Sequence, residues 1–369
     1  MTDRQTDRQT DRQTDRQTNY DLLRIICAIA IITIHVSATY KTPITSADND
    51  GQVYSNAYIM IVILYNTLSR FAVPCFLMLS GAFLLTNEKN SNYKYFYRKS
   101  FFKIGIPVII FTVLYIAYEI FLKLWHNIDD WKSCISIIKS LIVGRPFYHM
   151  WYVYMLIGIY LLIPVLIIFK GTVTEKTFSK IAWLFLLFGN LSIWTGTYLL
   201  QWDIGRSFCY LGYVMVGYEL RRLSEQTGKN NSKGCFFIVI GILLEIVVAY
   251  VQYRHTMAGI SEDAEKYSLI GPANPVITLA SIFIFAGFSF MHINGNFYKL
   301  SSYTFLIYLF HAGILDLIEK ISVHTGFGHP YCRLIPILII FVFFTSYLGA
   351  IIYNCIWNKI DNHIKLPRN

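Results

Sequence analysis

The chain has 369 residues, of which 55% are hydrophobic and only 15% are charged, and its mean hydropathy is +0.45. A soluble protein of this length carries more charge, and runs of about twenty apolar residues recur along the chain, so we predict an all-α polytopic membrane protein. In such a protein the net charge of +10 reports which loops stay in the cytoplasm, and it is not a nucleic-acid signature.

Residues 2–18 repeat Thr-Asp-Arg-Gln four times. This composition cannot form a core, so we predict a disordered cytoplasmic tail over residues 1–18. The codons ACA-GAC-AGA-CAG are the tetranucleotide ACAG repeated, and such tracts slip during replication. We therefore hypothesise a phase-variable gene, with a charged linker of no regulatory meaning as the alternative. Mixed synonymous codons across the repeat would remove the hypothesis.

The first predicted membrane helix begins at residue 19 and contains two ionisable side chains, Arg24 and His35. They are eleven residues apart, which is roughly three helical turns, so both lie on one stripe about 16 Å apart along the axis. Groups at such depth cost on the order of 2.5–3.5 kcal/mol each and usually mark function. We predict a polar path into the membrane; alternatively, Arg24 snorkels to the surface and His35 caps a helix end.

The apolar runs predict about ten transmembrane helices in one domain, residues 19–358, followed by a short basic cytoplasmic tail, 359–369. Basic residues favour one set of loops by about two to one, which predicts cytoplasmic N- and C-termini. The helices are expected near residues 22–39, 57–85, 101–124, 150–169, 180–200, 208–220, 235–253, 275–291, 303–320 and 334–356.

The second apolar run is too long for one straight crossing, and Arg70 and Pro74 are expected to break it. An arginine in mid-span stays charged and must find an anion or carbonyl oxygens. Since neither Arg24 nor Arg70 has an obvious carboxylate nearby in the sequence, we predict a bound phosphate-bearing ligand that enters from the cytoplasm. The alternative is pairing with an acidic residue in or near an apolar span, namely Glu119, Glu245, Asp316 or Glu319.

Aromatic side chains crowd the start of the fourth predicted span, around His149, Trp151 and Tyr152. They fit either a belt at the outer membrane interface or a lip on which a sugar stacks. His311 and Asp316 have the H-x4-D spacing of soluble acyltransferases, but positions five apart lie on different helix faces, so we interpret that match as accidental. A His311 that faces the bundle interior and contacts substrate remains a prediction.

The sequence contains no GxGxxG, Walker, HExxH or GxSxG motif and no CxxC pair among its seven cysteines. Serine-triad hydrolysis, nucleotide hydrolysis and metal catalysis therefore have no support, and no bound cofactor is expected. A polar stripe through a helical bundle is compatible with a transporter for a glycan or lipid-linked intermediate as well as with an enzyme. A sensor or scaffold is a third possibility, but no output domain is visible.

The segment NYDLLRIICAIAIITIHVS resembles the opening helix of acyltransferase family 3, integral-membrane O-acyltransferases whose best marker is an arginine and a histidine separated by ten residues. The resemblance continues in HMWYVYMLIGIYLLIPVL and SSYTFLIYLFHAGIL, and it covers nearly the whole hydrophobic chain. The chain resembles the short ten-helix branch of the family, similar to the enterobacterial common antigen O-acetyltransferases. In the segment LSRFAVPCFLMLSGAFLL the matching residues are Arg70, Pro74, Ser80 and Gly81.

This resemblance implies transfer of an acyl group, usually acetyl, from cytoplasmic acyl-CoA to a hydroxyl of a surface glycan or its undecaprenyl-linked precursor at the bacterial inner membrane. It also implies that Arg24, His35 and Arg70 are functional. A buried imidazole stays neutral and suits a general base, so we expect His35 to take that role. A buried guanidinium can stabilise an oxyanion or hold the CoA phosphates. The axial distance from Arg24 to His35 matches the reach of an extended pantetheine arm.

Overall fold

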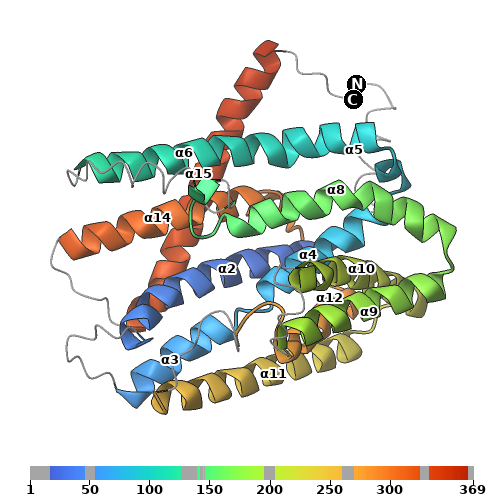
Figure 1. Ribbon diagram of the computed structural model, residues 1–369, viewed down its shortest axis with the longest axis horizontal. Coiled ribbons are helices and arrows are strands. Elements are labelled where there is room, and N and C mark those ends of the chain that lie inside the picture. Colours follow the sequence, from blue (N-terminus) through green and yellow to red (C-terminus); the bar gives the residue numbers. More distant parts are fainter. Residues whose placement is uncertain are drawn as a thin grey trace.

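A computed structural model describes residues 17–45, 55–125, 139–141, 144, 146–194, 204–259, 270–324 and 332–364. All regular structure in these ranges is helical, which confirms the predicted all-α membrane fold (Figure 1). The predicted disordered tail lies outside the described residues except for Gln17 and Thr18, the last of which already belongs to the first helix. Residues 365–369 of the predicted C-terminal tail also lie outside them.

Within the described residues, every predicted span coincides with one helix or with two consecutive helices; residues 195–200 of the span predicted at 180–200 lie outside them. The long helices are α2 (Thr18–Thr45), α3 (Asn56–Thr67), α4 (Ala72–Leu84), α6 (Ile106–Trp125), α8 (Trp151–Thr172), α9 (Glu175–Trp194), α10 (Ile204–Thr227), α11 (Asn231–Met257), α12 (Pro275–Phe290), α14 (Thr304–His324) and α15 (Ile335–Ile364). The short ones are η1 (Glu88–Ser91), α5 (Tyr93–Ser100), η2 (Phe101–Gly105), α13 (Tyr298–Ser301) and η4 (Cys332–Leu334).

Six helices or helix pairs in the described part of the chain are long and apolar enough to cross a membrane, and α12 is apolar but shorter. They are Thr18–Tyr40, Asn56–Leu84, Tyr93–Leu124, Trp151–Thr172, Asn231–Met257 and Ile335–Lys359. The protein is therefore a multi-pass membrane protein. Ten crossings and cytoplasmic termini remain predictions.

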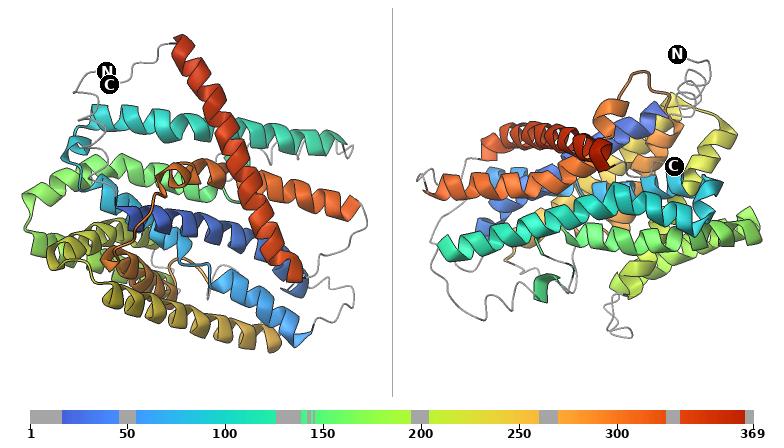
Figure 2. Two further views of the ribbon diagram at one scale, coloured as in Figure 1. Left: turned by 180° about the vertical axis from the view of Figure 1, so that it is seen from behind. Right: turned by 90° about the horizontal axis from the view of Figure 1, so that it is seen from above.

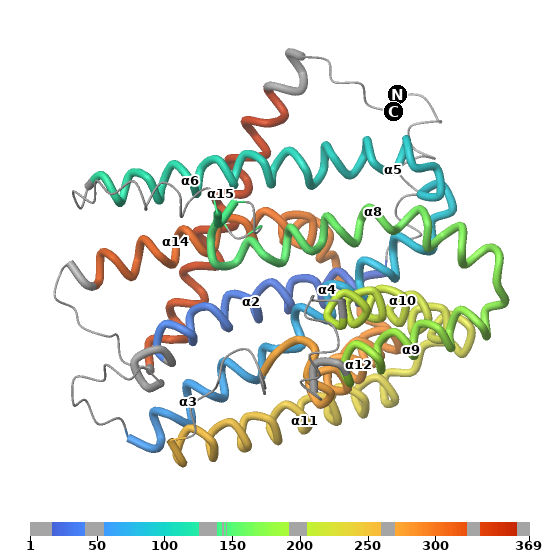
Figure 3. The backbone as a smooth tube through the Cα atoms, viewed as in Figure 1, coloured from blue at the N-terminus to red at the C-terminus, as the bar shows by residue number. Residues whose placement is uncertain are grey.

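Helix α2 lies in the middle of the bundle, with α6, α8 and α14 on one side and α3 and α11 on the other (Figures 1 and 3). It contacts α3, α4, α12, α14 and α15 directly. Helix α15 crosses the others at a steep angle (Figure 2). Apolar side chains on all sides of α2 are buried, among them Leu23, Cys27, Ile32 and Val36, as expected for a helix enclosed by protein. Most other long helices expose apolar side chains, which suits contact with lipid.

The predicted break in the second span is confirmed. Helix α3 ends at Thr67, residues 68–71 form a turn that contains Arg70, and α4 begins at Ala72. Pro74 lies in the first turn of α4, where its missing N–H removes no helical hydrogen bond. A break at membrane depth is tolerated only where protein or a polar cavity satisfies the freed backbone groups, so the surroundings of this turn are informative.

Helices α4 and α10 approach closely at Gly81 and Gly217. A Cβ atom at Gly217 would lie 2.1 Å from the Met78 carbonyl oxygen, and one at Gly81 would lie 1.7 Å from the Val214 carbonyl oxygen. Because these neighbours are backbone atoms, the helices would have to separate to admit a side chain. Small residues at such crossings are typical of membrane helix packing.

We therefore predict that Gly217→Ala lowers the melting temperature of the detergent-purified protein by at least about 3 °C, since overpacking costs about 1–3 kcal/mol. Gly158→Ala on α8 is the matched control, because a Cβ there meets no atom within 4 Å. Equal melting temperatures for the two variants would contradict the close crossing.

Candidate functional site

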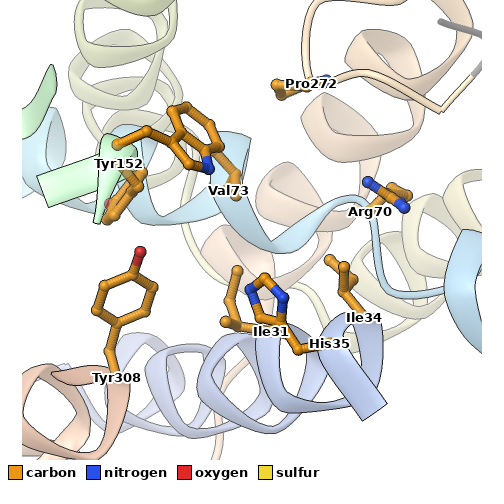
Figure 4. A pocket seen from close by; sticks show the side chains of 9 residues that line it. Ile31, Ile34, His35, Arg70, Val73, Tyr152, Pro272 and Tyr308 are labelled. Carbon is orange, nitrogen blue, oxygen red and sulfur yellow. The ribbon is translucent and has the colours of Figure 1, made fainter. Parts of the chain in front are cut away.

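A cavity of about 100 Å³ lies beside α2 at the level of His35 (Figure 4). The second-span turn contributes Arg70, and the start of α8 contributes Trp151 and Tyr152. Thus three separate segments that were predicted as functional meet at one cavity. The lining residues are Ile31, Ile34, His35, Arg70, Val73, Trp151, Tyr152, Pro272 and Tyr308.

The imidazole of His35 lies in an aromatic and histidine-rich environment. Its ring centroid is 5.1 Å from the ring of His311 on α14 and 5.1 Å from the ring of Tyr148. His149 packs behind them, with its ring 5.2 Å from that of His311. His149 and His311 are fully buried, and of these side chains only Tyr148 is well exposed, at 47%. His35 is thus at the boundary between the cavity and a histidine cluster, which we define as His35, His149 and His311.

The hydrogen bonds of the histidine cluster fix one tautomer. The Nδ1–H of His311 donates to the Tyr308 carbonyl oxygen at 2.5 Å, which leaves Nε2 with a lone pair. Among the residues that the structure describes, neither that Nε2 atom nor either ring nitrogen of His149 has a hydrogen-bond partner. Nevertheless, no group of three or more His, Cys, Asp or Glu side chains suited to holding a metal ion occurs in the described part of the chain. The cluster therefore offers proton acceptors beside the cavity.

Asn66 links Arg70 to α2. Its Oδ1 accepts hydrogen bonds from Nε of Arg70, at 3.2 Å, and from a terminal nitrogen of the same guanidinium. Its Nδ2 donates to the Ile34 carbonyl oxygen at 3.1 Å and to Ser37 Oγ at 3.0 Å. Since Ile34 precedes His35 in the chain, one buried amide fixes the guanidinium relative to the imidazole.

Glu245 of α11 supports the same turn from behind. It is buried, and a backbone hydrogen bond links Phe71, the last residue of the turn, to its carboxylate. The charge of Arg70 also acts on this carboxylate. A group freed by the break between α3 and α4 is therefore satisfied by an acidic side chain, as a break in the membrane requires.

Arg24 lies at the other end of the α2 stripe. It forms an ion pair with Asp21 at 3.0 Å, and Asp21 also accepts a hydrogen bond from Ser301 Oγ at 2.7 Å. The Arg24 guanidinium is 4.4 Å from the ring centroid of Phe83, and the Arg221 guanidinium is 5.0 Å from the same ring. Two guanidinium groups thus share one aromatic ring. We call Arg24, Phe83 and Arg221 the inner basic site.

A family model described as an acyltransferase domain matches residues 17–355. The chain belongs to acyltransferase family 3. Neither the comparison with curated proteins nor the comparison with solved structures found a match. The family match covers both ends of the α2 stripe, the second-span turn and the histidine cluster, so the protein is a multi-pass membrane acyltransferase. It does not single out the common-antigen branch.

The ion-pair and hydrogen-bond partners of Arg24 and Arg70 differ from those that the sequence predicted. Arg24 pairs with Asp21, three residues earlier on the same helix, so the expectation that it has no carboxylate partner nearby is wrong. Arg70 uses the Asn66 amide, with Glu245 close enough to act on it electrostatically. Of the carboxylates considered as alternatives, Asp316 instead pairs with Lys320 at 2.5 Å.

The path between Arg24 and His35 is closed. The cavity ends at Ile31 and does not reach Arg24, and the buried side chains of Cys27 and Ala28 fill the intervening stretch. Apolar side chains thus occupy the stripe between the two ionisable groups in this structure, and a polar path along α2 stays a prediction. His35 contacts other rings inside the protein, whereas the Arg24 side chain is 30% exposed, so the snorkelling alternative for Arg24 stays open.

The expectations for the fourth span are met in part. Trp151 and Tyr152 line the cavity, whereas His149 lies deeper in the protein and does not line it. An interfacial belt is wrong for His149 and Tyr152, since both are buried. His311 faces the bundle interior, and Asp316 accepts a hydrogen bond from Tyr118 rather than from His311, so the H-x4-D spacing is not a catalytic pair here.

Six residues that line the cavity or hold its charged groups were not predicted from the sequence, namely Ile31, Ile34, Asn66, Val73, Pro272 and Tyr308. Asn66 precedes Arg70 by four residues, and a polar side chain at that spacing in an apolar helix is a usable signal. Glu245 was noted only as one of four possible partners. Nothing in the sequence distinguishes Val73 or Tyr308 from the other apolar and aromatic residues, because their role follows from tertiary packing.

We predict that Glu245→Leu destabilises the protein and lowers acyl transfer, because it leaves the Phe71 N–H unsatisfied, at a cost of about 1–3 kcal/mol, and frees the Arg70 turn. Glu245→Gln keeps a hydrogen-bond acceptor and should retain most of the stability. Thermal unfolding and transfer assays on the two variants, with Glu119→Leu on α6 as control, test this. A Glu245→Leu protein as stable and active as wild type would contradict the role.

Proposed function

We propose that the protein is a membrane O-acetyltransferase that moves an acetyl group from cytoplasmic acetyl-CoA to a hydroxyl of a cell-surface polysaccharide or its undecaprenyl-linked precursor. The observation that supports it most directly is the convergence of His35 and Arg70 on one cavity, in a chain of acyltransferase family 3. The membrane is then the bacterial inner membrane. In this proposal the gene is also phase-variable, because a tetranucleotide tract that encodes the repeat tail slips during replication.

The inner basic site suits the nucleotide end of CoA. Guanidinium groups bind phosphate through charge-assisted hydrogen bonds, and a phosphate at this site competes with the carboxylates that pair with Arg24 and Arg221 in the structure, Asp21 and Glu225. Lys103 of η2 lies within electrostatic reach of Arg24 and adds a further positive charge. The pantetheine arm then follows the α2 stripe outward past Ala28. Ile31 and its neighbours close this route in the structure, so donor binding must move them.

In the cavity, the acceptor hydroxyl oxygen attacks the thioester carbonyl carbon while a ring nitrogen of His35 takes the hydroxyl proton. The charge on the tetrahedral oxyanion is stabilised by Arg70, whose guanidinium Asn66 holds in place. The C–S bond then breaks, and the CoA thiolate receives the proton from His35. The products are an ester and free CoA, and His35 returns to its neutral form.

The acceptor reaches His35 from the opposite side of the membrane. Tyr148 is exposed while its ring packs against His35, so it offers an aromatic face beside the proposed base. Sugars commonly stack on such rings. Trp151 and Tyr152 in the cavity wall can donate hydrogen bonds to the same acceptor.

We predict that His35→Ala reduces acetyl transfer by about 10²–10⁴-fold, the usual contribution of a general base. The measurement uses membrane vesicles that contain both enzyme and glycan, supplied with radiolabelled acetyl-CoA, and counts label in the glycan. His292→Ala, an exposed histidine between α12 and α13, is the control. Full activity of a correctly inserted His35→Ala protein would remove His35 from the reaction.

For the donor site, we predict that Arg221→Gln raises the KM for acetyl-CoA about tenfold or more with little change in kcat, since a charge-assisted hydrogen bond contributes about 1.5–3 kcal/mol. Arg222→Gln is the matched control, because it removes a neighbouring guanidinium that lies outside the inner basic site and that, like Arg221, pairs with carboxylates. Equal effects of the two substitutions would contradict phosphate binding at the inner basic site.

A further inference from the structure

The ring of His311 carries a buried lone pair that no donor in the described part of the chain uses. Its Nδ1–H donates to the Tyr308 carbonyl oxygen of the same helix at 2.5 Å, so Nε2 lies at the far edge of the ring, away from that carbonyl. This Nε2 atom has no partner among the described residues, and His311 is fully buried. An empty acceptor in a protein interior lowers stability, so its presence calls for an explanation.

The imidazole of His35 is a direct neighbour of this ring. The two ring centroids are 5.1 Å apart, and the ring planes are inclined by 39°. At this separation, rotation of His35 about its Cβ–Cγ bond can bring a ring nitrogen within hydrogen-bond distance of Nε2 of His311. Arg70 and Trp151, which line the cavity with His35 (Figure 4), can only donate hydrogen bonds. His311 therefore offers what those two side chains cannot, an acceptor for an N–H of His35.

The residues behind His311 hold its ring in place. The ring of His149 meets it edge to face, with centroids 5.2 Å apart, and the ring of Tyr308 lies 5.4 Å away. Tyr308 is itself anchored, because its hydroxyl group donates a hydrogen bond to the His149 carbonyl oxygen. Since its Nδ1–H is bound to a backbone carbonyl, His311 presents Nε2 in a fixed direction. A preorganised acceptor of this kind needs little reorganisation when charge develops beside it.

We propose that His311 is a positioning residue for His35, whose ring N–H donates to Nε2 of His311 during the reaction. The inference rests on the proposed function and adds a partner for its base. When one nitrogen of a neutral imidazole donates a hydrogen bond, the other nitrogen keeps its lone pair. The bond to His311 therefore fixes the tautomer of His35 in which a lone pair can face the acceptor hydroxyl.

This hydrogen bond strengthens as the reaction proceeds. When His35 takes the hydroxyl proton it becomes an imidazolium, and its hydrogen bond to His311 becomes charge-assisted. The proton stays on His35 until the CoA thiolate receives it, so no proton passes to His311. A second positive charge on the adjacent ring would repel the first. Because the bond is stronger in the transition state than in the ground state, it raises kcat and leaves substrate binding almost unchanged.

The test measures initial rates with radiolabelled acetyl-CoA in membrane vesicles that contain the enzyme and its glycan. His311→Leu removes the acceptor and should lower kcat by about 10–100-fold with little change in KM, as expected for a charge-assisted hydrogen bond made mainly in the transition state. His311→Gln returns an acceptor oxygen near the position of Nε2 and should recover most of the lost rate. Phe310→Leu, which removes a ring contact between α14 and Phe111, is the matched control and should leave kcat unchanged.

Nitrogen-15 NMR of the detergent-purified protein with labelled histidines separates positioning from a structural effect, because it reports which ring nitrogen carries the proton. The signals of His35, identified by their absence in His35→Ala, should show one tautomer in wild type and a mixture of two in His311→Leu. If His311→Leu does not reach the membrane, His311→Phe keeps an aromatic ring but has no lone pair, and the same loss of kcat is expected.

Two outcomes distinguish failure of this inference from failure of the proposed function. A wild-type kcat and an unchanged His35 tautomer in the His311 variants, while His35→Ala is inactive, would overturn the positioning role and leave the proposed function intact. A His35→Ala protein as active as wild type would overturn both.

Discussion

The structure depends on the enclosure of one helix. Helix α2 carries a guanidinium and an imidazole on the same stripe, and neither can face lipid without a cost of several kcal/mol. The other helices of the bundle surround α2 on nearly every side and so keep both groups away from lipid. Each of the two ionisable groups lies in a different environment. Arg24 receives a carboxylate partner from its own first turn, whereas His35 receives other imidazoles and a cavity.

The broken second span is the other half of this arrangement. An unbroken helix would carry Arg70 past the cavity wall, but the turn at 68–71 presents it to the cavity. Two side chains hold that turn in place. The Asn66 amide also donates a hydrogen bond to α2, and the Glu245 carboxylate comes from α11. Elements far apart in the chain therefore fix the Arg70 guanidinium relative to the His35 imidazole, which is the geometry that the proposed reaction needs.

Much of this architecture could be predicted from the sequence. Hydropathy located every long helix, and the pair Arg70 and Pro74 located the break, because these signals are local and strong. The Arg24 and His35 stripe followed from helical periodicity alone. The ion-pair and hydrogen-bond partners of the two arginines could not be predicted. Asp21 lies three residues before Arg24, but sequence spacing alone does not show which acidic side chain an arginine in a membrane helix pairs with. The burial of His149, which looks interfacial in sequence, depends on how the segment before α8 folds back into the bundle.

Buried apolar side chains occupy the stretch of α2 between Arg24 and His35. A donor bound at the inner basic site can reach the cavity only if Ile31 and the buried side chains near it move. Small residues on that stripe, Ala28 above all, keep the displacement modest. An enzyme that closes this route between turnovers also keeps water from the thioester and prevents a leak across the membrane.

The most direct measurement is a cryo-electron microscopy map of the protein in lipid nanodiscs with a non-hydrolysable thioether analogue of acetyl-CoA. The account predicts that the nucleotide lies at Arg24, Phe83 and Arg221, that the arm runs along α2, and that the acetyl mimic contacts His35 in the cavity. An analogue bound elsewhere, with the cavity beside His35 unchanged at saturating concentration, would contradict it.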